Sequence, residues 1–512
     1  MTLPSRRWPL QATLLSCWLG LAGCTTLTPQ AQTAALTAHA EAALGSATLK
    51  TLTVTGRGTG ASVGQAYAPG MAWPSLELTV LSRALNFETA SFREEFIRSR
   101  SESLGGGAVP LMGSGEARGV VLASAAHAWD VAGAATVSTP AALATRVHDL
   151  WTTTPQGAVK AAMAGAARAG VRREFLRRWD TLTFTMPGQF SATLVLEDTG
   201  LISRIESTVP DAVLGDMPVV TQFLDYRPQA GLMLPSRIVQ HQGGFAALDL
   251  EVIAVAADEP VEITVPDNVR AASETVSVEK VAEGVWFLAG GTHNSVAIEM
   301  AAQMVLVEAP LSEARARAVL DATNKLVPGK RALTVINTHH HFDHAGGLRF
   351  AAAQGATIFA SAPAKRYFET VFAQPTTPAP EALARPNLKP DLKPNRQPGR
   401  QPGFVAVEGK TVLGDAGRLV EIHELKDSIH ARGLLVVWLP REQLLIEADA
   451  YTPGAADAPP PAVLPAVPNA NHLNLVQNLD RLGLAPKRIL PLHGRVVPAS
   501  DLYMQVGRKP PP

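Results

Sequence analysis

The stretch that decides the fold reads THHHFDHAGG and spans residues 338–347. It contains the pattern His-x-His-x-Asp-His, whose four named positions are His339, His341, Asp343 and His344. In an extended segment, His339 and His341 lie on one side while His340 points to the other. Neutral imidazoles and a carboxylate are the ligands of zinc-type sites. The stretch therefore predicts a metal-dependent enzyme, and a solvated polar turn is the alternative interpretation.

Length and charge limit the class of protein. The chain has 512 residues, more than one compact core supports, so we expect two or more domains. Lys plus Arg and Asp plus Glu number 45 each, which gives a formal net charge of zero. Without a basic patch or a nucleic-acid-binding motif, the electrostatic signature of a nucleic-acid partner is missing. We expect a small-molecule substrate and no nucleic acid.

The first residues are typical of a targeting segment. Arg6 and Arg7 precede a short apolar run over residues 8–21, which is too short for a transmembrane helix. The run ends in Leu-Ala-Gly-Cys at residues 21–24, a tetrapeptide that resembles a bacterial lipobox. This resemblance predicts a lipoprotein signal peptide over residues 1–23 and a lipid-modified Cys24. An ordinary cleaved signal peptide is the alternative.

The predicted anchor also predicts a location. Thr25 follows Cys24 where an Asp would signal inner-membrane retention, so the resemblance implies an outer-membrane lipoprotein on the periplasmic side of the bacterial envelope. Acylation with more than one chain gives stable membrane attachment. The only other cysteine, Cys17, leaves with the signal, so the mature chain has one thiol and no intramolecular disulfide. Lipidation of that thiol would also exclude cysteine as a metal ligand.

A β-rich region is predicted over residues 46–270, after a linker over residues 24–45 that includes a helix. Apolar and polar residues alternate in several runs separated by Gly- and Pro-containing turns, which predicts an antiparallel sheet with one buried face. These runs are residues 76–80, 181–186, 191–196, 221–226, 236–242 and 247–255. An Ala-rich helical interval over residues 140–169 interrupts them.

Part of this region resembles the half-barrel of bacterial lipoprotein-carrier and lipid-binding periplasmic domains. The resemblance depends on Asp225-Tyr226-Arg227 and on the sequence GLMLPS at residues 231–236. It covers about 60 residues and includes no catalytic motif. A generic β-rich packing domain explains the same pattern.

The pattern of predicted elements changes at residue 277, after a polar, extended segment over residues 260–277. Strands alternate with helices from there on, which indicates an α/β domain over residues 277–512. The expected strands are residues 285–288, 296–299, 304–308, 333–337 and 356–360, and the expected helices are residues 312–325 and 346–354. A Pro-rich insertion over residues 374–403 interrupts this domain.

Completing the metal site requires later histidines and a carboxylate, and 9 of the 13 histidines follow residue 290. His430 is preferred over His423 because it lies in a turn beside a glycine, whereas His423 lies within a strand. His493 is preferred over His472 because it ends a strand in His-Gly, whereas His472 begins a helix.

Asp449 is the preferred bridging carboxylate. It follows the strand at residues 443–447, and ligands in open α/β sheets lie at such carboxyl ends. Glu447 competes, because residues two apart in a strand share one face.

These residues together resemble the metallo-β-lactamase-fold hydrolase superfamily over residues 285–498. The resemblance implies an αββα sandwich with two metal ions at one edge. The ligands implied for the first ion are His339, His341, His430 and Asp449, and those for the second are Asp343, His344, His493 and Asp449. Two departures from the family pattern are Ala448, where glycine is usual, and the long Pro-rich insertion.

The resemblance implies a hydrolase with two zinc ions per chain that acts on an ester, lactone, thioester or amide-type bond. Two ions lower the pKa of a bridging water from ~15.7 towards ~7. Asp343 would orient that water and take its proton. Tyr451 would donate a hydrogen bond to the oxyanion or, alternatively, pack beside the site.

Two other functions remain open from sequence: an iron-dependent oxidoreductase on the same fold, and a lipid- or envelope-binding lipoprotein. Diiron versions of this fold tend to carry a carboxylate where His341 stands, which favours zinc. Hydrolysis of β-lactams does not follow from the resemblance, because one fold supports many chemistries.

Overall fold

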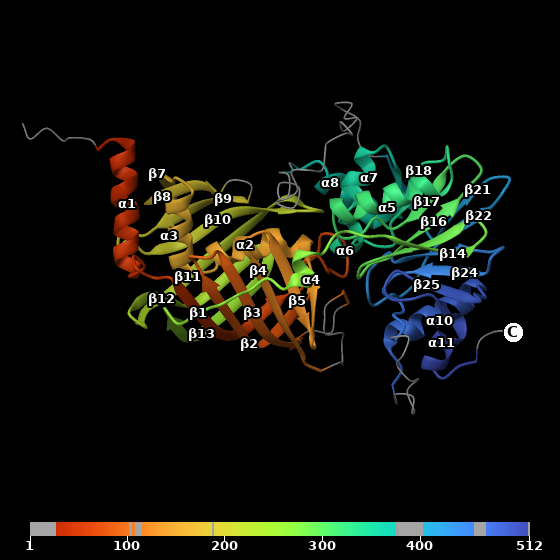
Figure 1. Cartoon of the computed structure of the whole chain (residues 1–512), viewed down its shortest axis with the longest axis horizontal. Coiled ribbons are helices and arrows are strands. Elements are labelled where there is room, and N and C mark those ends of the chain that lie inside the picture. Colours follow the sequence, from red (N-terminus) through yellow and green to blue (C-terminus); the bar gives the residue numbers. More distant parts are fainter. Residues whose placement is uncertain are drawn as a thin grey trace, which may run out of the picture.

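The computed structural model describes residues 27–101, 105–107, 115–186, 189–374, 376, 403–454 and 467–509. The predicted signal peptide, Cys24 and most of the Pro-rich insertion lie outside these residues. The described chain forms an elongated molecule in which a β-rich N-terminal region lies beside an α/β C-terminal region (Figure 1). Within the described part, no helix is both long and apolar enough to cross a membrane.

The N-terminal region is built on one antiparallel sheet of thirteen strands. Its order is β6-β5-β4-β3-β2-β1-β13-β12-β11-β10-β9-β8-β7, so the first strand pairs with the last and joins two runs of hairpins. The strands are β1 (Thr51–Ala61), β2 (Ser75–Asn86), β3 (Ser91–Arg100), β4 (Ala117–Ser124), β5 (His127–Ala132), β6 (Ala135–Ser138), β7 (Arg168–Glu174), β8 (Arg177–Met186), β9 (Phe190–Leu196), β10 (Ile202–Asp211), β11 (Gly215–Gln229), β12 (Leu232–Gln242) and β13 (Phe245–Ala257).

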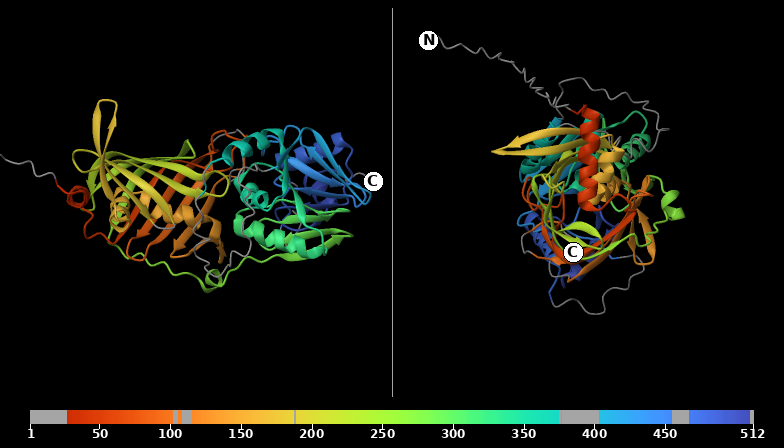
Figure 2. Two further views of the ribbon diagram at one scale, coloured as in Figure 1. Left: turned by 90° about the horizontal axis from the view of Figure 1, so that it is seen from above. Right: turned by 90° about the vertical axis from the view of Figure 1, so that its left-hand side faces the viewer.

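Helices cover one face of this sheet and bury its apolar side chains. They are α1 (Pro29–Leu44), η1 (Pro140–Ala142), α2 (Leu143–Thr152) and α3 (Pro155–Ala164). Figure 2 shows the strands curving past α1 and α3. Leu44 on α1 and Val159 on α3 share a core with the strand residues Leu52 and Leu194, all fully buried. The helix within the expected linker is therefore part of this core.

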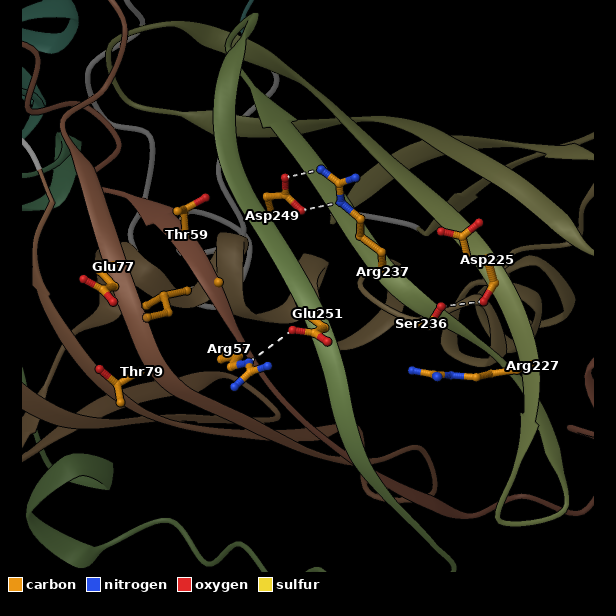
Figure 3. A pocket seen from close by; sticks show the side chains of 12 residues that line it. Arg57, Thr59, Glu77, Thr79, Asp225, Arg227, Ser236, Arg237, Asp249 and Glu251 are labelled. Carbon is orange, nitrogen blue, oxygen red and sulfur yellow. Dashed lines mark hydrogen bonds and ion pairs between the residues drawn. The ribbon is translucent and has the colours of Figure 1, made fainter.

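The opposite face of the sheet carries charged side chains that pair with each other. Arg57 on β1 bonds Glu251 on β13, and Arg237 on β12 makes a bidentate pair with Asp249 (Figure 3). More than half of each arginine side chain is exposed. Because these cations and anions satisfy one another across strands, this face is a solvated sheet surface.

The C-terminal region contains two sheets. The seven-stranded sheet comprises β14 (Ser277–Ala282), β15 (Val285–Ala289), β16 (Ser295–Glu299), β17 (Met304–Val307), β18 (Ala332–Ile336), β19 (Thr357–Ser361) and β20 (Gly403–Val407). The six-stranded sheet comprises β21 (Lys410–Gly414), β22 (Leu419–Glu424), β23 (Leu435–Leu439), β24 (Leu444–Glu447), β25 (Arg488–Pro491) and β26 (Val497–Pro498). The helices of this region are α5 (Glu313–Leu326), α6 (Phe342–Ala345), α7 (Leu348–Ala353), α8 (Ala362–Val371), α10 (Ala470–Leu482) and α11 (Ala499–Gln505). The short helix α4 (Asp267–Arg270) packs instead on the N-terminal sheet, where Val269 is buried beside Leu122 and Trp129.

Three apolar clusters show how the layers stack. Val296 on β16 and Val437 on β23 share a core, so the two sheets pack face to face. The outer face of the first sheet buries side chains of α5, α7 and α8, and the outer face of the second buries those of α10 and α11. This arrangement confirms the predicted αββα sandwich beside an antiparallel, β-rich region.

The two regions meet around the short helix α6. The ring of Trp73 packs edge-on against Phe342 on α6, with ring centroids 5.5 Å apart. Val213, in the turn between β10 and β11, is fully buried in the core beneath α7 and α8, and its carbonyl accepts hydrogen bonds from Arg349. The metal-ligand motif therefore lies where the N-terminal region covers the sandwich.

Candidate metal centre

Strand ends and the loops that follow them supply the predicted ligands. The motif His339 to His344 follows β18 and enters α6, and His430 lies in the loop between β22 and β23. Asp449 follows β24, and His493 follows β25. These strands end at one edge of the sandwich, so side chains up to 154 residues apart in sequence converge there.

The first cluster contains three histidines. His339 Nε2 lies 3.0 Å from His341 Nδ1 and 3.2 Å from His430 Nε2. All three side chains are buried. Three ring nitrogens that face one another at such short range suit a cation between them, to which each can offer a lone pair.

The second cluster contains His344, His493 and Asp343. His344 Nε2 lies 3.1 Å from His493 Nε2 and 3.8 Å from Asp343 Oδ2. Asp343 and His493 are the more exposed members, with 31% and 19% of their side chains accessible. Solvent therefore reaches the centre from this side.

Asp449 lies between the clusters. Its Oδ2 is 3.3 Å from His339 Nε2 and 3.4 Å from His430 Nε2, and its Oδ1 is 3.2 Å from His493 Nε2. Oδ2 also lies 2.8 Å from His344 Nε2. One carboxylate thus faces both sets of nitrogens, as a bridging ligand must. Its backbone has a φ of +59°, and such left-handed conformations at non-glycine residues cluster at functional sites.

In most of these histidines, the ring nitrogen that points away from the cluster lies close to an oxygen atom. His341 Nε2 lies 2.9 Å from the carbonyl of Ala66, and His493 Nδ1 lies 3.1 Å from the carbonyl of Thr292. A carbonyl only accepts, so these nitrogens carry the proton and the inward nitrogens keep their lone pairs. His344 Nδ1 faces the buried carboxylate of Glu308 at 3.1 Å, which fixes its ring in the same way.

The charges of the site favour a cation. Burial and neighbouring imidazoles hold the pKa values of His339 and His341 well below 6.5, so both rings are neutral. Burial would also lower the pKa of His344, but the carboxylates of Asp449 and Asp343 raise it well above 6.5. Burial alone would raise the pKa of Asp449, yet His344 and His430 hold it well below 3.8. The donor set therefore fits divalent metal ions, which would replace the proton on His344.

The competing residues lie elsewhere. Glu447 is fully buried, and its Oε2 accepts a hydrogen bond from the backbone N–H of Tyr451 at 3.0 Å, which shapes the turn that holds Asp449.

His423 is within β22 and pairs with Glu421 at 2.8 Å. His472 lies in the first turn of α10, against the ring of Tyr451. None of the three belongs to the clusters of the described residues.

Tyr451 packs on the far side of the second sheet. Its side chain is 1% exposed and lies in the core shared with α10 and α11, with its hydroxyl 3.5 Å from Gln505 Nε2. Burial raises its pKa to about 12. These contacts favour the packing interpretation over a hydrogen bond to an oxyanion.

The sequence analysis missed the contribution of the N-terminal region. Gln65 Nε2 donates a hydrogen bond of 2.8 Å to Asp343 Oδ1, and the Ala66 carbonyl accepts from both His340 and His341. The backbone of Gly107 comes so close that a Cβ atom there would lie 2.9 Å from His341 Nδ1. No local pattern marks these residues, because their partners are more than 200 positions away.

His293 was also missed as part of the cluster. It lies in the short loop between two of the expected strands, residues 285–288 and 296–299. In the structure His293 is 7% exposed, and its Nε2 lies 3.1 Å from Asp343 Oδ2. The GTHN sequence before β16 was the available signal.

Residues 288–494 match the family model described as the metallo-beta-lactamase superfamily. The C-terminal region therefore belongs to this superfamily, and every candidate ligand lies within the matched residues. Membership supports a metal-dependent hydrolase in general. No curated protein matches the chain.

Three solved structures are similar to part of this chain. A metallo-beta-lactamase from Pontibacter korlensis is 17% identical with a TM-score of 0.33, over 46% of this chain and 98% of that chain. A metallo-beta-lactamase from Hirschia baltica is 20% identical with a TM-score of 0.32, over 45% and 95%. Rubredoxin oxygen:oxidoreductase from Desulfovibrio gigas is 18% identical with a TM-score of 0.34, over 45% and 60%.

Proposed function

We propose that this protein is a dinuclear zinc hydrolase that cleaves an ester, lactone, thioester or amide-type bond in a small molecule. The observation that carries the proposal is the position of Asp449, whose carboxylate lies within 3.4 Å of histidine nitrogens of both clusters. A single metal ion needs no second cluster of ligands, whereas a carboxylate that lies near both clusters can bridge two ions. The superfamily membership of residues 288–494 supports a hydrolase of this general kind.

Zinc is proposed because imidazoles dominate the donor set. Histidine nitrogens with one or two carboxylates suit zinc, and His341 occupies the position where iron versions of the fold tend to carry a carboxylate. When bound, a pair of zinc ions lowers the pKa of water and polarises a carbonyl.

The chain's own groups would orient the reaction. Asp343 is held from two sides, by Gln65 on Oδ1 and by His293 on Oδ2, and it lies on the exposed side of the centre. A carboxylate fixed in this way orients the attacking water and accepts its proton. The carbonyl of Ala66 and the backbone of Gly107 lie against His341, whose side chain is fully buried.

We further propose that lipid-modified Cys24 tethers the enzyme to the periplasmic face of the outer membrane. The Leu-Ala-Gly-Cys sequence supports this location. Mass spectrometry of the mature N-terminus and membrane fractionation of a Cys24→Ala variant test it. A soluble wild-type protein with an unmodified N-terminus would contradict it.

Metal analysis combined with a substrate screen tests the main proposal. We expect two zinc ions per chain and turnover of at least one class among lactones, esters, thioesters and β-lactams. His341→Ala should lose zinc and turnover together. Iron in place of zinc, with oxygen consumption, would favour the oxidoreductase, and a protein that takes up no metal would overturn both enzymatic functions. Full cellular activity of His341→Ala would favour a binding lipoprotein.

A further inference from the structure

We propose that His293 is an additional ligand of the second metal ion, so that this ion takes three histidines, Asp343 and the shared Asp449. The inference deepens the proposed function and rests on it, because it requires an ion between His344 and His493. His293 comes from the loop between β15 and β16, outside the His-x-His-x-Asp-His motif and the three later ligands.

The ligand atoms form a group of suitable size. His293 Nε2, Asp343, His344 and His493 each present a donor atom within 4.8 Å of the others. The measured separations are 3.1 Å from His293 Nε2 to Asp343 Oδ2 and 3.1 Å from His344 Nε2 to His493 Nε2. Donors about 2.0–2.2 Å from a zinc ion lie about 3.3 Å apart around it, so these separations fit one shared ion.

His293 also has the same hydrogen-bond pattern as the other ligands. Its Nδ1 lies 2.8 Å from the hydroxyl oxygen of Thr292 while its Nε2 faces the cluster. The backbone carbonyl of the same threonine holds Nδ1 of His493. An oxygen on the remote nitrogen fixes the tautomer and orientation of a metal-bound imidazole. Thr292 therefore orients two rings toward one point.

The loop that carries His293 is rigidly built. Arg315 on α5 is 1% exposed, and its guanidinium donates to the carbonyls of Thr275, Gly290 and His293. On the other side, Asn294 donates through its side chain to the carbonyls of Pro491 and Gly494, which flank His493. A loop without a ligand would not need a buried arginine and a second anchor beside His493.

The alternative role for His293 is to donate a hydrogen bond to Asp343 without contacting the ion. The protonation state of the His293 ring does not distinguish the two roles, because burial lowers its pKa to about 4 and the ring is neutral in either case. Position favours the ligand role, because His293 offers a donor atom within 4.8 Å of those of Asp343, His344 and His493. Its ring also lies beside both histidines, with centroids 4.2 Å from that of His493 and 5.0 Å from that of His344.

A crystal structure of the zinc-loaded wild-type protein tests the inference directly. We expect two zinc ions and a His293 Nε2–Zn distance of about 2.0–2.2 Å. Two ions with His293 still bonded to Asp343 and more than 3 Å from either ion would overturn the inference while leaving the proposed function intact. Uptake of no zinc would overturn both.

Zinc titration against a competing chelator gives a second, solution readout. In His293→Ala we expect one ion to bind as in the wild type and the affinity for the other to fall more than 100-fold. His472→Ala is the control, because it removes a histidine of the same region that lies outside the clusters; its two affinities should not change. Circular dichroism checks that each variant folds. Unchanged affinities in a folded His293→Ala would contradict the inference.

Discussion

At the scale of single residues, Asp449 and Glu447 show how two carboxylates in one short stretch acquire opposite properties. Asp449 is surrounded by imidazoles, which hold its pKa well below 3.8. Glu447 is fully buried without a cation in contact, and burial raises its pKa well above 4.5. The first is thus ionised and suited to hold metal, whereas the second is a neutral hydrogen-bonding group.

This contrast gives a paired prediction. Asp449→Asn keeps the shape but removes the charge that faces both clusters, so we expect zinc affinity to fall more than 100-fold and turnover to be lost. Glu447→Gln replaces a neutral carboxyl by a neutral amide, so both zinc ions should remain. Metal-to-protein ratios after dialysis measure the effect. The reverse result would identify Glu447 as the bridging ligand.

His472 allows a prediction of pH dependence away from the metal ligands. Burial lowers its pKa to about 4, against about 6.5 in an unfolded chain. Below pH 6.5 the unfolded state binds a proton that the folded state excludes, so this group destabilises the fold progressively down to about pH 4. Between pH 7 and pH 4, the unfolding free energy of His472→Gln should therefore fall by about 2 kcal/mol less than that of the wild type. Urea unfolding at both pH values measures it, and an identical loss in both proteins would contradict the assignment.

The residue scale is also where the sequence was most informative. A ligand motif confined to six positions is recognisable because its chemistry is local, and the later candidate ligands stood out as a histidine in a turn beside a glycine and as a histidine and an aspartate after strands. The role of Thr292 and Glu308 in orienting rings depends on three-dimensional neighbours. No pattern in the sequence shows these contacts.

At the scale of elements, helix α5 fixes the loop of His293 through Arg315. Arg315→Lys keeps the charge but removes the planar group that donates to three carbonyls. Hydrogen bonds to charged groups contribute about 1.5–3 kcal/mol each, so we expect the unfolding free energy to fall by about 2–4 kcal/mol.

Arg317→Lys on the same helix is the matched control for this change. Its guanidinium pairs with Glu313 on the surface and lies 4.4 Å from the ring centroid of Phe350, so the expected effect is within about 1 kcal/mol. Urea denaturation measures both variants. Equal unfolding free energies of the two variants would show that Arg315 does not stabilise the loop of His293.

Element types were largely predictable, whereas their pairing was not. Alternating residues indicated strands such as β12 and β13, and the Ala-rich interval became α2 and α3. The pairing of β1 with β13, between Leu52 and Ala257, joins residues about 200 positions apart. Such contacts depend on the whole sheet, and neither the hydrophobic pattern nor the turns of one strand specify them.

At the scale of the whole molecule, the N-terminal region does more than lie beside the sandwich. The segment over residues 64–67 and Gly105–Gly107 contacts the loops of the metal centre: Gly106 donates to the carbonyl of Ile429, and Arg432 donates through its backbone to Tyr67. These two loop residues flank His430. The candidate centre is therefore assembled from both regions, which explains why the sequence of the C-terminal region indicated candidate ligands but not the N-terminal residues that contact them.

Gln65 tests this assembly, because its side chain is the direct polar link from the N-terminal sheet to a predicted ligand. Gln65→Ala removes the donor to Asp343 Oδ1 without touching the sandwich, and the loss of such an outer partner typically costs 10–100-fold in metal affinity or activity. Gln65→Glu should lower zinc affinity and turnover further, because it places a second carboxylate against Asp343.

Gln222 is an exposed glutamine on β11, so Gln222→Ala is the control and should behave as the wild type. Zinc affinity and turnover are measured together. If Gln65→Ala matches the control in both, the N-terminal region only covers the site and does not position Asp343.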